Sequence, residues 1–318
     1  MKKYSNPISC SLLMVVTSND LYIAMYTIQS LKKIINIENL IVKIFANGLN
    51  ENQENKICSL ISRWENVDLE SNREYINNNK KQIESQIGKS FYDEKGRLQL
   101  RQGLCEPGPS IWERELIKFD TQLVGIIDAD FEILDARYFI NMLNEMNQNS
   151  KIGIFSTDYT ETKDYYNYYT TLDNTYSDPK TVLMGRYHTW FCLYERNLLN
   201  IDSNFSYIEE ERDKLLYTYD HSAKLQEKLI NEFGLQAKYL TPNYKWCYLH
   251  YGAFAKNKTL KGLNLFLYRI FRIGIHNGFK HIINVPSINR KIYWISKRVF
   301  SIFNFNRYDS ERLKFSWQ

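Results

Sequence analysis

Paired cysteines, long hydrophobic runs and a recognisable signal peptide are all missing from this sequence of 318 residues. The five cysteines lie far apart without CxxC spacing, which excludes a disulfide framework or a thiolate zinc site and favours a reducing compartment. No apolar run approaches the roughly 18 to 20 residues that span a bilayer, so no transmembrane segment is expected. The N-terminal stretch MKKYSNPISCSLLMVV is interrupted by Asn6 and Pro7 and lacks a small-residue cleavage site, so we interpret it as leading into a first strand.

Negative charge is scarce in residues 256–318, which contain 13 Lys and Arg but only Asp309 and Glu311. The preceding residues contain 28 basic and 34 acidic side chains. Within the basic segment, RKIYWISKRVFSIF has apolar residues at helical spacing and predicts an amphipathic helix that lies on an anionic membrane surface. A helix packed on the preceding domain, with solvated lysines, explains this pattern equally well. No nucleic-acid recognition motif accompanies the charge, so we expect no nucleic-acid partner.

Buried-strand patterns alternate with amphipathic helices over most of the chain, whose 44% hydrophobic and 15% aromatic content is sufficient for a large core. This order predicts an α/β fold with parallel strands and helical crossovers, and Asp20 is placed to cap the first helix. We expect strands within 8–20, 39–50, 66–72, 123–127 and 151–159, and helices within 21–35, 51–64, 111–120 and 136–146. The polar residues 74–110, which end in EPGPS, interrupt the pattern and predict an insertion or loop.

Two aspartates one residue apart end the apolar run in VGIIDADFEIL, residues 124–134. Ligands bind at the carboxyl ends of strands in open α/β sheets, which is where Asp128 and Asp130 are expected. Because side chains alternate on an extended chain, both carboxylates can face one cation, and such oxygen donors suit Mg²⁺ or Mn²⁺. A strand end followed by a helix cap would also explain the two residues.

Residues 8–255, with the DAD segment after a central strand, resemble the GT-A fold glycosyltransferases, whose DXD motif holds the metal and diphosphate of a nucleotide sugar. The segment LLYTYDHSAKLQEKLINEFGLQAKYL, residues 215–240, is similar to the ED segment of the inverting family 2. The resemblance implies that Asp220 is the catalytic base; an ordinary helix N-cap is the alternative for this residue. The nearby Glu209, Glu210 and Glu211 are competitors for the same role, or form a solvated charged face.

The resemblance also implies a nucleotide contact at the ends of the first two strands, by Thr17, Asn19 and Asn47. Here the sequence FANG departs from the Asp that family 2 tends to carry, which leaves the base and its contact residue open. Arg114, on the helix before DAD, is in reach of a phosphate or is simply an exposed helical arginine.

Aromatic residues in LMGRYHTWFCLYERNLL, residues 183–199, suit either an acceptor site or the core. Tyr187, His188 and Trp190 are the candidates for stacking on a sugar. Further on, HYGAFAK at 250–256 loosely resembles the HxxGxxK motif of the retaining family 8, with the glycine one position early. That resemblance implies His250 as a metal ligand and Lys256 on the diphosphate; a satisfied structural histidine is the alternative.

Taken with these resemblances, the sequence predicts a GT-A (Rossmann-like) domain over 1–255, with a mostly parallel mixed sheet, a nucleotide-binding half (1–135) and an acceptor half (136–255), followed by the helical basic segment 256–318. The implied function is a Mn²⁺- or Mg²⁺-dependent, inverting hexosyltransferase. We expect a nucleoside-diphosphate sugar as donor, with UDP favoured, and a glycan or lipid-linked glycan as acceptor. The expected process is bacterial surface polysaccharide synthesis, on the cytoplasmic face of the membrane. A retaining family 8-like enzyme and a non-catalytic nucleotide-sugar-fold scaffold are the alternatives.

Overall fold

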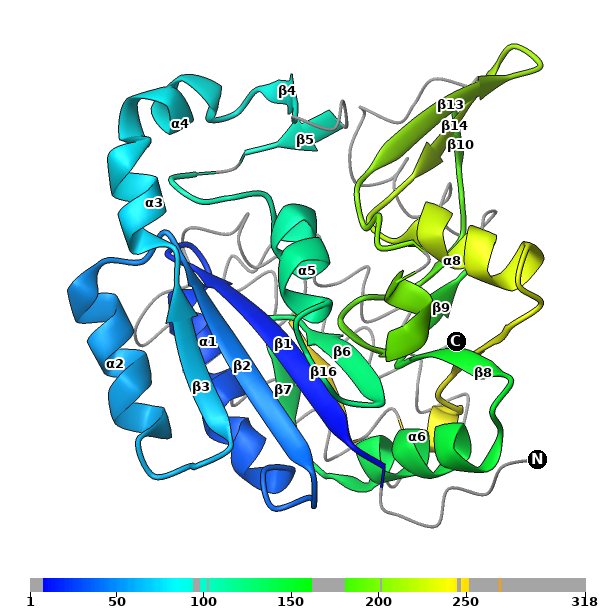
Figure 1. Cartoon of the computed structure of the whole chain (residues 1–318), viewed down its shortest axis with the longest axis horizontal. Helices are drawn as coiled ribbons and strands as arrows, with labels where there is room; N and C mark the ends of the chain where they lie inside the picture. Colours follow the sequence, from blue (N-terminus) through cyan, green and yellow to red (C-terminus); the bar gives the residue numbers. More distant parts are fainter. Residues whose placement is uncertain are drawn as a thin grey trace, which may run out of the picture.

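A seven-stranded sheet organises the part of the chain that the computed structural model describes, which comprises residues 8–93, 98–101, 103–161, 181–200, 202–244, 247–251 and 269 (Figure 1). Its order is β15-β8-β12-β6-β1-β2-β3, and neighbours are parallel except that β12 is antiparallel to both β6 and β8. The strands are β1 (Cys10–Thr17), β2 (Leu40–Asn47), β3 (Val67–Ser71), β6 (Leu123–Ile127), β8 (Ile152–Ser156), β12 (Phe191–Glu195) and β15 (Gln236–Tyr239). The predicted α/β class with a mostly parallel mixed sheet is therefore confirmed.

Helices cover both faces of this sheet, as the sequence of β1 requires. Leu12 and Met14 belong to one hydrophobic cluster and Leu13 to another, so the alternating side chains of the strand are buried on both sides. Residues from α1, α2 and α6 line the first cluster, and residues from α5 and α8 line the second. These helices are α1 (Leu21–Ser30), α2 (Glu51–Ile61), α5 (Gly108–Leu116), α6 (Arg137–Gln148) and α8 (Ala223–Asn231).

The N-terminus of α2 has a side-chain cap, whereas that of α1 does not. Asn50 and Gln53 form a reciprocal capping box at the start of α2, which satisfies backbone N–H groups that the helix leaves free. Asp20 occupies the predicted N-cap position of α1, but its side chain makes no capping hydrogen bond and instead accepts one from the Thr17 hydroxyl. The predicted helix over 21–35 ends at Ser30 and continues as the 3₁₀ turn η1 (Leu31–Lys33).

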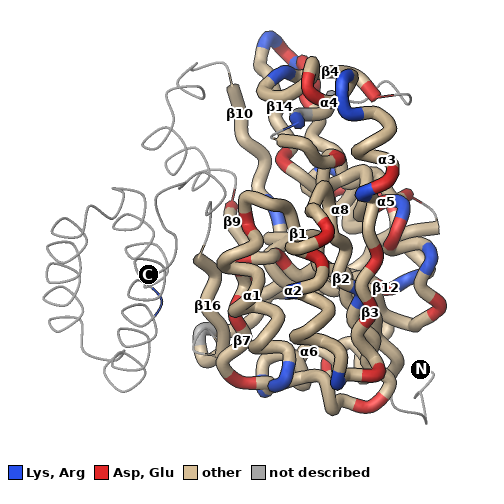
Figure 2. Tube along the Cα trace, turned by 90° about the vertical axis from the view of Figure 1, so that its left-hand side faces the viewer, with Lys and Arg blue, Asp and Glu red and all other residues tan. Residues whose placement is uncertain are grey.

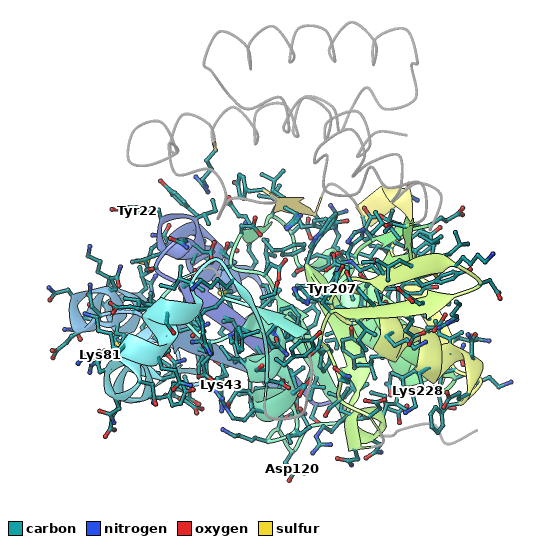
Figure 3. The ribbon with its side chains drawn as sticks, turned by 90° about the horizontal axis from the view of Figure 1, so that it is seen from above. Tyr22, Lys43, Lys81, Asp120, Tyr207 and Lys228 are labelled. Atoms are coloured by element: carbon teal, nitrogen blue, oxygen red, sulfur yellow. The ribbon has the colours of Figure 1, made fainter. Side chains whose placement is uncertain are left out.

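The predicted insertion at 74–110 contains short elements outside the main sheet. They are α3 (Arg73–Asn78), α4 (Lys80–Gln86) and the hairpin of β4 (Ser90–Tyr92) with β5 (Leu98–Leu100). In the view from above, Lys81 on α4 and Lys228 on α8 lie at opposite sides of the molecule (Figure 3).

Strands that follow β6 in the sequence form several smaller antiparallel and mixed sheets. A three-stranded sheet has the order β10-β14-β13, and two-stranded pairs form between β9 and β11 and between β7 and β16. They consist of β7 (Phe131–Ile133), β9 (Tyr159–Thr160), β10 (Thr181–Leu183), β11 (Arg186–Tyr187), β13 (Ile208–Arg212), β14 (Leu215–Tyr219) and β16 (Tyr248–His250), with the 3₁₀ turns η3 (Arg196–Asn200) and η4 (Pro242–Tyr244) nearby. The β7–β16 pair contacts α1 and holds part of the candidate site.

Acidic and basic residues are interspersed along the described part of the chain (Figure 2). None of the described helices combines the length and the hydropathy needed to cross a membrane. The predicted domain boundary at 255/256 and the basic segment that follows it lie outside the described residues, with the exception of Arg269.

Candidate metal and donor site

Three side chains that can bind a metal meet at the carboxyl end of β6. Asp128 and Asp130 follow that strand directly, and His250 lies on β16 opposite Phe131 of β7. The Nε2 atom of His250 is 3.1 Å from Oδ1 of Asp130 and 3.7 Å from Oδ2 of Asp128. One ligand atom from each of the three lies within 4.8 Å of the others, and among the described residues this is the one such group of His, Cys and acidic side chains.

This donor set fits a divalent cation. Carboxylate oxygens suit Mg²⁺ and Mn²⁺, and an imidazole nitrogen beside them favours the transition metal of the two. The side chains of Asp128, Asp130 and His250 are 30%, 13% and 8% exposed, so the group is open to solvent mainly through Asp128. A cation bound here would therefore keep positions for ligands other than protein.

Backbone hydrogen bonds fix both aspartates. The amide of Asp128 donates to the carbonyl of Trp190 at 2.8 Å, and the carbonyl of Asp130 accepts from the amide of Tyr251 at 2.9 Å. The two aspartates are thus attached to the chain just before β12 and just after β16. The site depends on three segments that lie far apart in the sequence.

A column of three aromatic rings supports His250. The Trp190 ring stacks on His250, with centroids 4.0 Å apart and planes 22° from parallel, and on His188 at 4.0 Å and 19°. His188 is buried, and its Nε2 lies 2.6 Å from the hydroxyl of Thr160. Because both faces of Trp190 are covered by histidines, the sugar-stacking role considered for Trp190 is incompatible with this arrangement, and the core-like alternative holds. Tyr187 packs against Tyr159 with ring centroids 4.6 Å apart.

Negative charge accumulates at this end of the sheet. Burial raises the pKa of Asp128, with a further contribution from the charge of Asp130, while His250 and Arg186 act in the opposite direction. Burial also raises the pKa of Asp20 to about 6, and the charges of Asp130 and Asp128 add to that effect. Three carboxylates on the ends of two neighbouring strands create a field that a divalent cation would neutralise.

Asp220, the predicted base, forms an ion pair with Arg186 of β11. Its Oδ2 lies 2.9 Å from Nη2 of Arg186, whose side chain is 9% exposed, and its Oδ1 accepts the amide of His221 at 2.8 Å. Nη1 of Arg186 donates to the carbonyl of His221 at 3.0 Å. Burial lowers the pKa of His221 while the charges of Asp220 and Asp128 raise it, so the ion pair and the metal group share one electrostatic neighbourhood.

The alternative explanation of Asp220 as a helix N-cap is wrong. Helix α8 begins at Ala223 and its N-cap is Ser222, which has a left-handed backbone with φ of 68°. The Asp220 carboxylate contacts Arg186 and His221 instead. The predicted order of acidic residue, helix, glycine turn and strand is present as Asp220, α8, Gly234 with φ of +63° and β15.

Thr17 and Asn19 lie at the carboxyl end of β1, beside Asp20. The Thr17 hydroxyl donates to Asp20, and Asn19 is exposed in the turn that follows the strand. Both positions therefore remain compatible with the predicted contact to a nucleotide.

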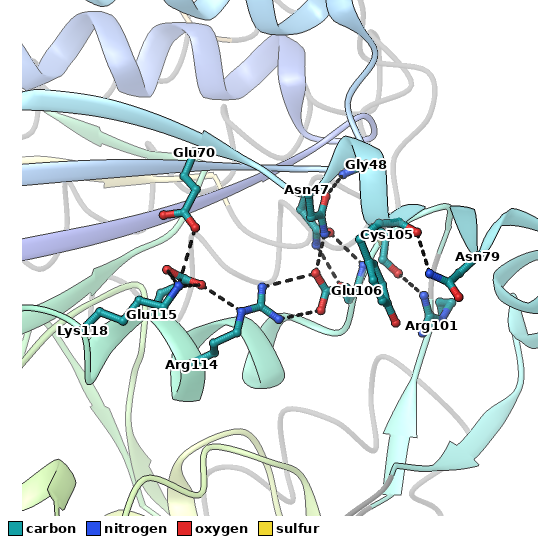
Figure 4. A network of polar contacts seen from close by, with 12 residues as sticks. Asn47, Gly48, Glu70, Asn79, Arg101, Cys105, Glu106, Arg114, Glu115 and Lys118 are labelled. Carbon is teal, nitrogen blue, oxygen red and sulfur yellow. Dashed lines mark hydrogen bonds and ion pairs between the residues drawn. The ribbon is translucent and has the colours of Figure 1, made fainter. Parts of the chain in front are cut away.

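Asn47 and Arg114 belong to a polar network around Glu106 (Figure 4). Asn47 is 1% exposed; its amide nitrogen donates to the Glu106 carbonyl and its oxygen accepts the Glu106 amide, both at 2.8 Å. Arg114 donates to both carboxylate oxygens of Glu106, at 2.8 and 3.3 Å. Asn72 bonds both Asn47 and Glu106. A nucleotide contact by Asn47 would require this network to open, so in this conformation it holds the loop of residues 103–107 on the end of β2.

Sequence reasoning missed the partners of these residues. Arg186, Glu106 and Glu132 are not candidates from the sequence, because a single polar residue outside a motif gives no periodic signal. Asp20 had a usable signal, since it follows the first strand of the α/β pattern by three residues, but it was interpreted only as a cap.

No protein-family model matches the chain, and no curated protein matches it either. Among solved structures, it is similar to a mannosyltransferase of Pyrobaculum calidifontis in complex with GDP-mannose and Mn²⁺, with a TM-score of 0.45 and 11% identity over 74% of this chain and 55% of that one. It is also similar to glucosyl-3-phosphoglycerate synthase of Mycobacterium tuberculosis in complex with Mn²⁺, UDP and glucosyl-3-phosphoglycerate (TM-score 0.44, 10% identity, 85% and 78% coverage). The bifunctional glycosyltransferase WbbM gives a TM-score of 0.43 at 9% identity, over 84% of this chain and 52% of that one.

The match thus spans about half of the mannosyltransferase and of WbbM. These likenesses are at the level of fold, and the function proposed below is based on the geometry of the site and on the resemblance of its sequence motifs.

Proposed function

We propose that this protein is a metal-dependent glycosyltransferase that moves a sugar from a nucleoside-diphosphate sugar to a saccharide or lipid-linked acceptor. The observation that carries the proposal is the group of Asp128, Asp130 and His250 at the carboxyl end of β6, where ligands bind in sheets of this type. Two carboxylates and an imidazole in a partly open position suit a cation that also contacts phosphate oxygens.

Glycosyl transfer requires stabilisation of the leaving diphosphate and deprotonation of the attacking hydroxyl. When bound, the divalent cation supplies a Lewis acid that neutralises the departing diphosphate. Asp128 and Asp130 would hold this cation through carboxylate oxygens, and His250 would supply a nitrogen ligand. Thr17 and Asn19, at the end of the neighbouring β1, would contact the nucleoside.

Asp220 is the proposed base. The acceptor oxygen attacks C1 of the donor sugar, the bond from C1 to the phosphate oxygen breaks with its electrons going to the diphosphate, and the hydroxyl proton passes to the Asp220 carboxylate. Arg186 holds that carboxylate in place through its 2.9 Å ion pair. A single displacement of this kind inverts the anomeric centre, and NMR of the purified product would report the configuration.

Two alternatives remain for comparison. A retaining reaction, with His250 on the metal and Lys256 on the diphosphate, would give a product of retained configuration. A non-catalytic scaffold with the same fold would bind a nucleotide sugar without turning it over. The joint presence of the metal group and of the Asp220–Arg186 pair favours an enzyme over the scaffold.

The assignments of donor and product rest on the sequence resemblance, and the membrane assignment rests on the charge of the C-terminal segment. We propose a hexose as the transferred sugar, UDP as its carrier and bacterial surface polysaccharide as the product. We further propose that residues 256–318, with 13 basic and two acidic side chains, hold the protein on the inner face of the cytoplasmic membrane.

The proposed activity is tested by release of nucleoside diphosphate from UDP- and GDP-sugars with Mn²⁺, for the parent, Asp130→Ala and Asp120→Ala. Asp120 is exposed and precedes the other end of β6, so it controls for loss of one negative charge. We expect release that requires Mn²⁺ in the parent and the control and is lost in Asp130→Ala. Metal-independent release, or release unchanged in Asp130→Ala, would contradict the proposal.

A further inference from the structure

A buried carboxylate lies directly beside the metal group. Glu132 of β7 is two residues beyond Asp130 and is only 3% exposed. Its Oε2 accepts the hydroxyl of Tyr251 at 2.5 Å and Nε of Arg269 at 2.9 Å, and its Oε1 accepts Nη2 of Arg269. Both oxygens are therefore hydrogen-bonded, and one arginine supplies the positive charge.

That arginine comes from the C-terminal segment. Arg269 is separated from Glu132 by 137 positions, and its guanidinium also lies over the ring of Tyr26 on α1, 4.5 Å from the ring centroid. The contact is thus a bidentate ion pair backed by an aromatic face, a geometry that Arg provides and Lys does not. The side chain of Arg269 is 24% exposed and that of Glu132 is 4% exposed, so the carboxylate is the more deeply buried partner.

Loss of the Arg269 guanidinium would leave the negative charge of the Glu132 carboxylate buried without a positive partner. Removing one partner of a buried charge pair is strongly destabilising, because the remaining charge stays desolvated. A displacement of Glu132 would also displace the metal group, because the two are connected by backbone pairing and hydrogen bonds. Glu132 pairs with Leu249 across β7–β16, one position from His250, and Tyr251 bonds both the Glu132 side chain and the carbonyl of Asp130.

We propose that Arg269 is a positioning residue for the metal site, which it stabilises by neutralising Glu132, a residue of the β7–β16 pair that contains His250 and directly follows Asp130. The basic C-terminal segment then has a second role besides any surface charge, because it supplies one residue that the site requires. This inference rests on the metal-binding part of the proposed function and is independent of the donor, the acceptor and the stereochemistry.

The test is Mn²⁺ binding by the full chain without donor or acceptor, measured as free Mn²⁺ by electron paramagnetic resonance. The variants are Arg269→Ala, Arg269→Lys, the double variant Glu132→Gln/Arg269→Gln and, as control, Arg137→Ala, which breaks an exposed ion pair with Asp135. We expect the Kd of Arg269→Ala to rise about tenfold, the lower limit typical for loss of groups that orient metal ligands. We expect partial rescue by Arg269→Lys, which keeps the charge, and an unchanged Kd in the control.

The double variant removes both charges and keeps hydrogen-bonding groups, so it should fold and bind Mn²⁺ within about threefold of the parent. If Arg269→Ala does not fold, the double variant provides the test on its own. A tenfold rise in its Kd for Mn²⁺ would overturn the neutralising role of Arg269. An Arg269→Ala variant that binds Mn²⁺ as the parent does would overturn the inference and leave the proposed function intact. A parent that binds no Mn²⁺ would refute both.

Discussion

The ring of Trp190 lies flat on the imidazole of His250, with centroids 4.0 Å apart, while its backbone carbonyl accepts the amide of Asp128 at 2.8 Å. One residue therefore contacts two members of the metal group. Its other face rests on His188, which is fixed by Thr160, so the position of His250 is set by a continuous column of packed rings.

The first prediction concerns that column. Trp190→Leu should weaken Mn²⁺ binding by about tenfold, because the His250 ring loses the flat surface that orients it. Trp190→Phe, which keeps a ring, should bind within about threefold of the parent. Isothermal titration with Mn²⁺ measures both, with Trp64→Leu as control, since Trp64 packs at the edge of the core near α2. Equal Kd values for the Leu and Phe variants would show that the stacking has no role in the site.

The second prediction concerns Asp20 and pH. Its pKa is about 6 in the folded chain against an ordinary 3.8, so ionisation of Asp20 disfavours the folded state. That destabilisation is absent below about pH 4 and complete above about pH 6, because the folded state binds the extra proton between these values. Asp20→Asn keeps an acceptor for the Thr17 hydroxyl and cannot ionise. Its stability relative to the parent should therefore increase from pH 4 to pH 7.

Urea unfolding in metal-free buffer measures this difference, and the exposed Asp68→Asn serves as control. Parallel stability curves for Asp20→Asn and the parent across this pH range would contradict the assignment of a raised pKa to Asp20.

The third prediction compares two glycines with the same backbone conformation. Gly48 has φ of +70° and a Cβ there would lie 1.8 Å from the carbonyl oxygen of Leu104, whereas Gly88 has φ of +73° with nothing within 4 Å. Gly88→Ala should cost about 1 kcal/mol of stability, the penalty for a side chain in left-handed backbone. Gly48→Ala should cost at least about 2 kcal/mol more, because the loop of residues 103–107 must move off the end of β2. Denaturant unfolding gives both values, and equal costs would place that loop elsewhere.

The fourth prediction tests Asp220 as the base. Asp220→Asn should lower kcat by about 10²- to 10⁴-fold, the usual contribution of a general base, while Mn²⁺ binding stays near the parent value. Glu211→Gln is the control, since Glu211 is an exposed acidic residue of the nearby β13. If Glu211→Gln lost activity and Asp220→Asn retained it, the base would have to be sought on β13.

The fifth prediction separates membrane charge from the Arg269 contact. Truncation after residue 257 would remove both, so the informative variant is Lys291→Gln/Lys297→Gln/Arg298→Gln, which keeps Arg269. Binding to anionic liposomes should fall by roughly 3 kcal/mol, about 1 kcal/mol for each basic side chain near the surface. Mn²⁺ affinity should not change. Liposome sedimentation measures the first quantity, and equal sedimentation of variant and parent would refute a membrane role for these residues.

Much of the fold could be predicted from local patterns. β6 is buried on both faces and turns polar at Asp128, so its sequence indicated both a central strand and the edge at which ligands bind. The direction of β12 could not be predicted, because a buried run such as FCLYE has the same pattern whether the strand is parallel or antiparallel. His250 was a candidate through the resemblance alone.

The partners of the site residues could not be predicted from the sequence, for a physical reason. Asn47 bonds Glu106 across 59 positions, and Glu132 bonds Arg269 across 137, so these contacts depend on how loops return to the sheet. A single polar residue carries no periodic signal that would fix such a return. Burial, which decides whether Asn47 faces a ligand or a loop, emerges only when the chain is folded.

The most direct measurement of the central claim is thermal unfolding with UDP, GDP, dTDP and CMP, each with and without Mn²⁺, for the parent, Asp130→Ala and Asp120→Ala. A ligand at about 100 times its Kd adds roughly 2.7 kcal/mol of stability, which appears as a raised midpoint. The account predicts that one nucleoside diphosphate stabilises the parent and Asp120→Ala only when Mn²⁺ is present, and does not stabilise Asp130→Ala. Stabilisation that is independent of Mn²⁺ or of Asp130, or no stabilisation by any nucleotide, would contradict it.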